Sequence, residues 1–298
     1  MAVIDAQVHL NRDIGVDAAI FAMDAVGIDA VLIDERSGFD SFIKGNGRPY
    51  TLLPNGAIRA EYPLAREAVR RYPGRFAYAG RIDPNDPEMR HLVQDIAANP
   101  HQVCVRMSPK PALGEVDALR DGHYDALLSE LEAAGVPLML WIPSGLNWVP
   151  RLAEKFSGLS IILDHCGVLP VPKEGPIDRD FLFRTTAELA RFENVAVKLS
   201  HAPRLSQMPF PFVDLLPHIR RLVDSYGVSR VMWASDHTQT KRHHAWSEAL
   251  MYLQVPGVLS DDEREWIFFR TARELLSWPV TEIFGLYREG VGRDGREN

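Results

Sequence analysis

Three short segments, far apart in the sequence, each carry an apolar run into residues that could bind a metal ion or move a proton. Residues 3–9 end in His9, residues 160–165 end in His165, and residues 231–237 contain Asp236. Imidazole and carboxylate groups are common zinc ligands and common general acids and bases. If the segments are strands of one parallel barrel, their carboxyl ends meet at one mouth, and His9, His165 and Asp236 come together there.

The first of these segments carries polar residues at every second position. Successive side chains of a strand point to opposite faces, so we expect Asp5, Gln7 and His9 to share one face. Two ligands at i and i+2 can reach one ion, as in the His-x-His pair of many barrel hydrolases, but Gln7 occupies the first of these positions. An amide oxygen binds zinc more weakly than imidazole, so a mononuclear site of Gln7, His9, His165 and Asp236 is expected to be weak or absent. The alternative is a strand end whose polar groups only bind neighbouring loops.

The other two segments admit a catalytic and a structural interpretation. Gly167 follows His165 closely and would let a substrate approach the backbone, which fits a ligand or an oxyanion-polarising group. The alternative is a structural histidine whose hydrogen bonds are satisfied. Asp236 could hold a metal ion and accept a proton from a nucleophilic water. His237 follows it, and we expect the pair 243–244 to lie on a surface helix.

Two cations interrupt apolar strand runs. Arg106 lies in the run 103–108 and Lys198 in the run 195–201. A charge in such a run is costly unless it is paired. Each could bind a substrate carboxylate, for which the guanidinium fork of Arg106 is well suited, or form a structural ion pair with Asp83 or Asp164.

The rest of the chain alternates apolar strand runs with helical patterns. The predicted strands are 3–9, 30–34, 76–82, 103–107, 137–142, 160–164, 195–199 and 230–234, and the predicted helices are 17–26, 63–71, 87–98, 124–134, 148–156, 181–192, 213–226 and 261–276. This alternation predicts a single-domain (β/α)8 TIM barrel over 1–280, with a C-terminal tail over 281–298. An open doubly wound sheet is the alternative, but no Gly-x-Gly-x-x-Gly follows the first strand. The long connections 35–54 and 169–176 are where we expect specificity to lie.

Composition limits the partners. The chain has 298 residues, 46% hydrophobic residues and a net charge of -7, without a long basic tract, so we expect a small-molecule substrate and no nucleic acid. Neither an apolar run of about 18 residues nor a signal-peptide core occurs, so we expect no membrane association. Cys104 and Cys166 are expected to be buried free thiols, which favours the reducing cytoplasm. The oligomeric state stays open, a homo-oligomer included.

Read together, these segments resemble the amidohydrolase-related (amidohydrolase 2) family of barrel hydrolases and decarboxylases. They are most similar to its sugar lactonase and 2-pyrone-4,6-dicarboxylate lactonase subgroup. The matching motifs are Ile4-Asp5-Ala6-Gln7-Val8-His9, Leu163-Asp164-His165-Cys166-Gly167, Val197-Lys198-Leu199-Ser200, Met232-Trp233-Ala234-Ser235-Asp236 and the closing stretch from 259 to 272.

The resemblance implies a mechanism. Asp236 would activate water as the base, while His9 and His165 would polarise a lactone carbonyl or bind a metal ion. The residues expected to contact the substrate are Arg106, Lys198, His201 and Trp141. Gln7 departs from the family pattern, and the fifth strand, 137–142, has no His or Lys where binuclear relatives carry a ligand. We therefore expect one divalent ion, zinc or manganese, or none.

The function expected from this resemblance is hydrolysis of a small carboxylated or sugar-derived lactone. One rival is a metal-dependent decarboxylase of an aromatic or unsaturated acid, against which Gln7 counts. The other is a barrel that has lost catalysis and only binds a ligand, against which Asp236 and His165 count.

Overall fold

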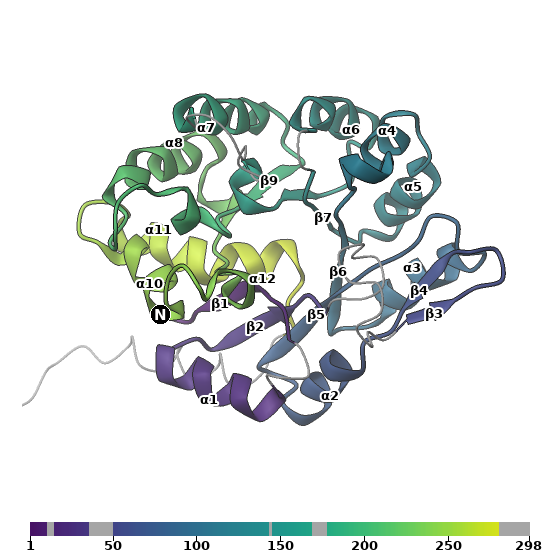
Figure 1. Ribbon diagram of the computed structural model, residues 1–298, viewed down its shortest axis with the longest axis horizontal. Helices are drawn as coiled ribbons and strands as arrows, with labels where there is room; N and C mark the ends of the chain where they lie inside the picture. Colours follow the sequence, from purple (N-terminus) through teal and green to yellow (C-terminus); the bar gives the residue numbers. More distant parts are fainter. Residues whose placement is uncertain (11–14, 36–49, 143–144, 169–177, 280–298) are drawn as a thin grey trace, which may run out of the picture.

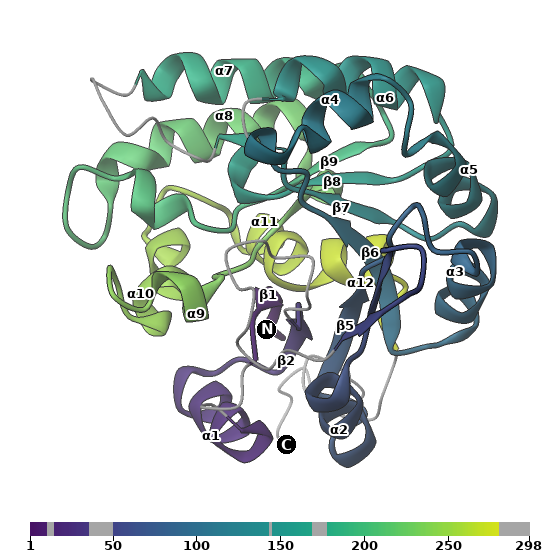
Figure 2. The same ribbon diagram turned by 45° about the vertical axis from the view of Figure 1, so that its right-hand side comes forward.

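The computed structural model describes residues 1–10, 15–35, 50–142, 145–168 and 178–279. Eight parallel strands form one sheet in the order β1-β2-β5-β6-β7-β8-β9-β10. Their bounds are Ile4–Val8, Ala30–Ile33, Phe76–Gly80, Gln102–Met107, Leu138–Leu140, Ile161–Leu163, Val195–Lys198 and Val231–Met232. Figure 1 shows the helices arranged around these strands, and Figure 2 shows the same arrangement from the side. The predicted TIM barrel is confirmed, with all eight strands in the expected places.

The helices that follow the strands also match the prediction closely. They are α1 (Val16–Val26), α2 (Pro63–Arg71), α3 (Met89–Ala98), α4 (Glu115–Arg120), α5 (Asp125–Ala134), α6 (Val149–Lys155), α7 (Arg179–Glu188), α8 (Leu216–Tyr226), α9 (His237–Thr240), α10 (Trp246–Met251), α11 (Asp261–Glu265) and α12 (Thr271–Leu275). Three short helices, α4, α9 and α10, and one hairpin were not predicted. An antiparallel hairpin, β3 (Tyr50–Leu52) with β4 (Ile58–Ala60), begins inside the expected loop 35–54 and lies outside the barrel sheet.

The barrel closes between β1 and β10 with few hydrogen bonds. The Ala6 amide donates to the Trp233 carbonyl at 3.3 Å, and the Asp236 amide donates to the Gln7 carbonyl at 3.0 Å. The Trp233 amide instead donates to the Ile267 carbonyl at 2.8 Å. Ile267 lies in a π-helical turn, Trp266–Arg270, between α11 and α12, and a π turn displaces carbonyls from the regular helical ladder. The predicted helix 261–276 therefore forms with a π turn that meets the last strand.

Alternate residues of the strands build the barrel interior. Ile4, Ala6, Leu32, Ala79 and Met232 belong to one buried cluster together with Ala30, Ala77, Val103, Cys104, Met139, Ile162, Ala196 and Ala234. The next inward position on most strands is charged, as at Asp34, Arg81, Arg106, Asp164, Lys198 and Asp236. A polar layer therefore lies on the apolar one at the carboxyl end of the barrel.

The first strand breaks this alternation. The pairing of β1 with β2 shifts between Asp5 and Val8, where β1 contains one residue more than the paired stretch of β2. Before the shift Ile4 and Ala6 belong to the interior cluster, and after it Val8 packs in the outer core. A bulge of this kind re-aims the side chains that follow it. The expectation that Asp5 shares a face with His9 is wrong: Asp5 accepts hydrogen bonds from Trp246 Nε1 on α10 and from Ser235, whereas His9 contacts Asp236 at the mouth.

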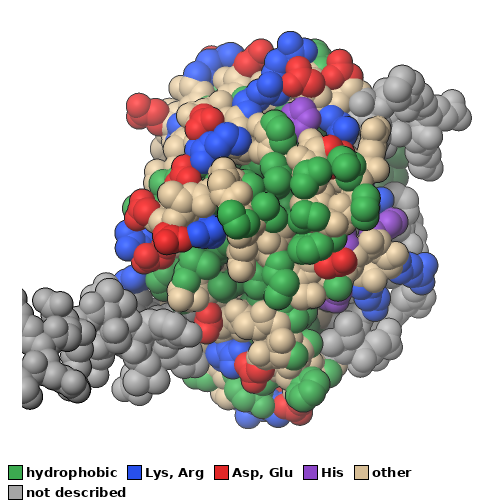
Figure 3. Space-filling model, turned by 90° about the vertical axis from the view of Figure 1, so that its left-hand side faces the viewer, with side chains coloured by type: hydrophobic (Ala, Val, Ile, Leu, Met, Phe, Trp, Pro, Cys, Tyr) green, Lys and Arg blue, Asp and Glu red, His purple; other side chains and the backbone are tan. Residues whose placement is uncertain are grey.

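Several further predictions can be compared with the described residues. Cys104 and Cys166 are buried free thiols, as expected. Within the described ranges no helix is both long and apolar enough to cross a bilayer. The loop residues 36–49 and 169–177 and the tail from 280 onward lie outside the described residues, so the specificity and domain-boundary predictions stay predictions. Figure 3 shows apolar side chains gathered between charged ones on one face. The exposed large apolar side chains include Phe181, Phe210, Val213 and Met251.

Candidate active site

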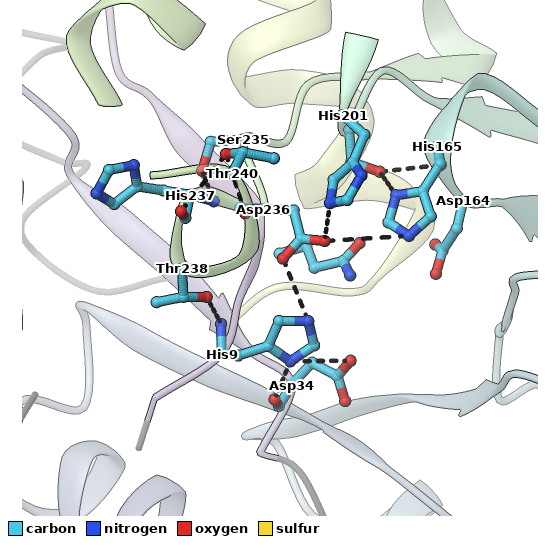
Figure 4. Close-up of polar contacts among 12 residues, drawn as sticks. His9, Asp34, Asp164, His165, His201, Ser235, Asp236, His237, Thr238 and Thr240 are labelled. Atoms are coloured by element: carbon cyan, nitrogen blue, oxygen red, sulfur yellow. Dashed lines mark hydrogen bonds and ion pairs between the residues drawn. The ribbon is translucent and has the colours of Figure 1, made fainter. Parts of the chain in front are cut away.

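Asp236 is the centre of the polar layer at the mouth of the barrel. Its carboxylate is buried, and three imidazoles face it (Figure 4). His201 Nε2 lies 2.6 Å and His165 Nε2 4.0 Å from Oδ2, while His9 Nε2 lies 3.2 Å from Oδ1. The structure thus brings together His9, His165 and Asp236, as predicted, and adds His201 to them.

His9 is oriented by its neighbours on β2 and α9. Its ring Nδ1 lies 2.7 Å from the Asp34 carbonyl oxygen and 3.4 Å from Asp34 Oδ2, and its backbone amide donates to Thr238 Oγ1. A carbonyl oxygen can only accept, so Nδ1 carries the hydrogen. The other ring nitrogen, Nε2, is therefore turned toward Asp236.

His165 and His201 stack on each other beside the carboxylate. Their ring centroids are 4.2 Å apart, and the Trp141 ring meets His165 edge-on at 5.7 Å. Ser200 Oγ lies 2.8 Å from His165 Nδ1 and also accepts the His165 backbone amide, which fixes the ring with Nε2 toward Asp236. Burial, with His201 adding to it, holds the pKa of His165 well below 6.5, so this imidazole is neutral near pH 7.

Asp236 is ionised in this setting. Burial by itself would raise the pKa of Asp236, but the adjacent His9 and His201 outweigh it and hold that pKa well below its usual value. The Asp236 carboxylate is therefore an anion that three imidazole rings face. Such an anion can accept a proton from a water molecule placed at the mouth.

A belt of alternating charges lies beside Asp236, one group from each of five strands. Asp34 binds Arg81 through both oxygens, at 2.8 and 2.9 Å, and Arg106 Nη1 at 2.7 Å. Asp164 binds Arg106 Nε at 2.6 Å and Lys198 Nζ at 2.7 Å. Burial opposes ionisation of both carboxyls, yet the cations outweigh it and keep the pKa values of Asp34 and Asp164 low. Three cations face these two carboxylates, and the ionised Asp236 beside the belt supplies a third negative charge.

For Arg106 and Lys198 the structure therefore shows the ion-pair alternative, with Asp164 as the shared partner. Lys198 is fully buried and lies next to Met139 Sδ and the Ala6 carbonyl below the mouth. Arg106 also lines a cavity of about 270 Å³, together with Arg81, Ser108, His123 and Tyr124. Of the two cations, Arg106 can thus face both its carboxylate partners and a molecule in the cavity.

The residues fit a divalent cation. His165, His201 and Asp236 each offer a ligand atom within 4.8 Å of the other two, and all three side chains are buried. The Nδ1 atom of His201 has no hydrogen-bond partner among the described residues, and neither have the two amide atoms of Gln7. Unpaired buried polar atoms are costly, and two imidazoles with one carboxylate form a donor set that zinc commonly uses. The ligand set predicted from the sequence shares His165 and Asp236 with this group. It also contains Gln7 and His9, and it lacks His201.

The pair His243 and His244 does not lie on a surface helix. Residues 241–244 lie in a turn, and His244 is buried, with its ring 6.1 Å from that of Phe212. His237 stacks flat on Trp246 at 5.1 Å, and burial, with His244 adding to it, lowers the pKa of His237 to about 4. These rings form a wall beside the site.

Two residues of the belt, Asp34 and Arg81, were missed in the sequence. Each is a charged residue at the carboxyl end of an apolar strand run, which is the signal that identified Asp236. Applied to every strand, that signal would have found both.

Comparison with known proteins agrees with this architecture. Residues 4–278 match the family model described as Amidohydrolase, and the chain belongs to this amidohydrolase family. The 4-sulfomuconolactone hydrolase of Hydrogenophaga intermedia is 30% identical over 174 residues, which are 57% of this chain and 54% of that protein. The chain therefore matches about half the length of this curated relative.

Two solved structures share the fold. A Burkholderia multivorans amidohydrolase with bound zinc superposes with a TM-score of 0.68 at 16% identity, covering 94% of this chain and 100% of that one. A probable 2-pyrone-4,6-dicarboxylic acid hydrolase of Acinetobacter baumannii with bound citric acid gives a TM-score of 0.68 at 19% identity, covering 93% and 100%. Across nearly the whole chain, the barrel is that of the amidohydrolases.

Proposed function

We propose that this protein hydrolyses a small lactone that carries a carboxylate or sugar-derived hydroxyl groups. The observation that carries the proposal is the ionised Asp236 carboxylate, faced by His9, His165 and His201 at the mouth of the barrel. The family match and the likeness to a named lactone hydrolase support it.

In the proposed reaction, Asp236 takes a proton from water as the water oxygen attacks the lactone carbonyl carbon. His165 stabilises the negative charge that develops on the carbonyl oxygen, and His9 does so as the doubly protonated imidazolium, because its Nδ1 hydrogen is bound to the Asp34 carbonyl. The ring C–O bond then breaks, and Asp236 returns the proton to the leaving oxygen. The second proton of the water leaves the new carboxyl group to solvent, so the products are a carboxylate, a released proton and a hydroxyl or its keto form.

The belt would bind the rest of the substrate. The guanidinium groups of Arg81 and Arg106 line the cavity and favour an anionic group placed beside the scissile bond. Trp141, whose ring meets that of His165, would contact the substrate ring, whereas Lys198 would act only through Asp164.

A divalent cation held by His165, His201 and Asp236 would supply Lewis acidity at the carbonyl oxygen. We propose zinc rather than manganese, because two imidazole ligands suit zinc better than the oxygen-rich sites that manganese favours. The two buried free thiols are in keeping with a reducing cytoplasm.

The test is a panel of carboxylated and neutral lactones, with ring opening followed by proton release. We expect turnover of at least one carboxylated lactone and a loss of about 10²–10⁴-fold in the Asp236→Asn variant. Asp262→Asn, at an exposed position of α11, is the matched control and should keep wild-type activity. Unchanged hydrolysis after Asp236→Asn would refute the mechanism.

Decarboxylation is the second candidate, and the candidate cation ligands favour it. The same variants can be assayed for release of carbon dioxide from aromatic and unsaturated acids. Release from these acids without any lactone turnover would replace the hydrolase proposal.

A further inference from the structure

We propose that this chain binds a zinc-class divalent cation through His165, His201 and Asp236, and that neither Gln7 nor His9 is a ligand. The ligands would then come from the ends of β8, β9 and β10, without the i, i+2 pair of the first strand. The inference concerns the site of the proposed function but does not depend on the reaction performed there.

The two oxygens of Asp236 separate the surrounding imidazoles into two groups. His165 and His201 face Oδ2, at 4.0 and 2.6 Å, whereas His9 faces Oδ1 at 3.2 Å. A cation among the first group shares Oδ2 with two nitrogens. His9 then stays on the other oxygen, where it can donate or receive a proton.

His201 has the features of a ligand without an ion. It is 7% exposed, and its ring Nδ1 is buried without a hydrogen-bond partner among the described residues. Its Nε2 lies 2.6 Å from Asp236 Oδ2. A ring nitrogen and a carboxylate oxygen this close can both bind one ion, which would compensate their desolvation.

The ring of His165 is oriented in the way that is usual for a metal-binding histidine, with one nitrogen hydrogen-bonded and the other left for the ion. Its Nδ1 is engaged by Ser200 Oγ at 2.8 Å, which leaves Nε2 for an ion beside Asp236 Oδ2. His9 has a comparable partner in the Asp34 carbonyl. The distinction between the two therefore rests on which carboxylate oxygen each faces, and it requires a direct test.

Gln7 replaces a nitrogen ligand by a neutral amide, and His201 supplies a nitrogen from the opposite side of Asp236. Two imidazoles and one carboxylate leave a coordination position open, which is the composition of catalytic rather than structural zinc sites. The Gln7 amide, with both polar atoms unpaired, would then be free to bond the substrate.

The test uses the full-length protein, freed of metal by a chelator and titrated with Co²⁺, a spectroscopic substitute for zinc. Visible absorption gives stoichiometry and affinity, and displacement by Zn²⁺ gives the zinc affinity. No substrate is present, so the result is independent of any hydrolase assay. The variants are His201→Gln, His165→Gln, His9→Gln and Gln7→Leu, and each is checked for a cooperative thermal transition.

We expect one Co²⁺ per wild-type chain. His201→Gln and His165→Gln should weaken binding by more than the about 10–100-fold seen when a residue that only orients a ligand is lost. Gln7→Leu and His9→Gln should stay within about tenfold of wild type on the same scale. Wild-type protein that binds no Co²⁺, or His201→Gln that binds like wild type, overturns the inference.

Two further outcomes separate this inference from the proposed function. If His201→Gln does not fold, the His9→Gln and Gln7→Leu titrations decide, since a large loss of affinity in either places the ion on the first strand and refutes the inference. Co²⁺ binding as expected in a protein without lactone turnover would refute only the hydrolase proposal. Turnover by a protein that binds no metal would refute only the inference.

Discussion

Lys198 Nζ lies 2.7 Å from Asp164 Oδ1, and neither side chain is exposed to solvent. This pair ends the belt that continues through Arg106 and Asp34 to Arg81. A buried pair is weak evidence for stability by itself, but removing one partner leaves the other charge without compensation.

Lys198→Met should therefore destabilise the protein by about 3–5 kcal/mol, because Asp164 loses one of its two cations in a fully buried place. Urea unfolding measures the change. Lys155→Met is the matched control, since Lys155 pairs with Asp125 at the surface, and a change below about 1 kcal/mol is expected there. Equal destabilisation in the two variants would mean that the charge balance of the belt does not contribute to stability.

Gln7→Leu should make the metal-free protein more stable by about 1–3 kcal/mol. The reason is that both amide atoms of Gln7 are buried without a hydrogen-bond partner among the described residues, and the substitution removes their desolvation cost. Gln94→Leu, on the exposed face of α3, should change stability by less than about 0.5 kcal/mol. A destabilised Gln7→Leu variant would show that the amide has partners that stabilise it.

His165→Gln should reduce the dependence of stability on pH between 7 and 5. The native pKa of His165 lies well below 6.5, because of burial, so only the unfolded chain takes up a proton there as the pH falls. Wild-type stability should therefore fall by up to about 2 kcal/mol between pH 7 and pH 5 through this residue, a loss that the variant lacks. Unfolding of metal-free protein at several pH values measures it, and His91→Gln, at an exposed position, should keep the wild-type slope.

Arg106→Lys should discriminate between substrates. It keeps the charge of the belt but loses the fork that can hold a carboxylate at two points beside the cavity. We expect kcat/KM to fall about tenfold or more for a carboxylated lactone and to fall less for a neutral lactone of the same ring size. Equal losses on both substrates would assign Arg106 to the ion pairs with Asp34 and Asp164 alone.

Much of the barrel and the centre of the site could be predicted from the sequence. Apolar runs of four to six residues identify buried parallel strands, and the meeting of strand ends at one mouth follows from topology, so His9, His165 and Asp236 were placed together correctly. The shift in β1 could not be foreseen, because it depends on pairing with β2 and not on the residues of β1 alone. The hairpin β3–β4 was missed because its residues are largely exposed and lack an apolar pattern.

The position of His201 was also beyond the sequence. It follows β9 by three residues, and only the left-handed backbone at His201, with φ of 61°, places its ring on Asp236. Burial of His244 likewise depends on packing against Phe212, which lies more than thirty residues earlier in the chain.

His165, His201 and Asp236 share a backbone conformation that costs the fold energy. Their φ angles are 55°, 61° and 50°, in the region that glycine adopts freely and other residues enter at a cost of about 1 kcal/mol or more each. Glycine at any of the three would relax the chain and remove a functional group at once. A lineage that is no longer selected for catalysis would thus gain stability by replacing these residues with glycine. Natural variants that keep all three side chains are therefore expected to keep the activity.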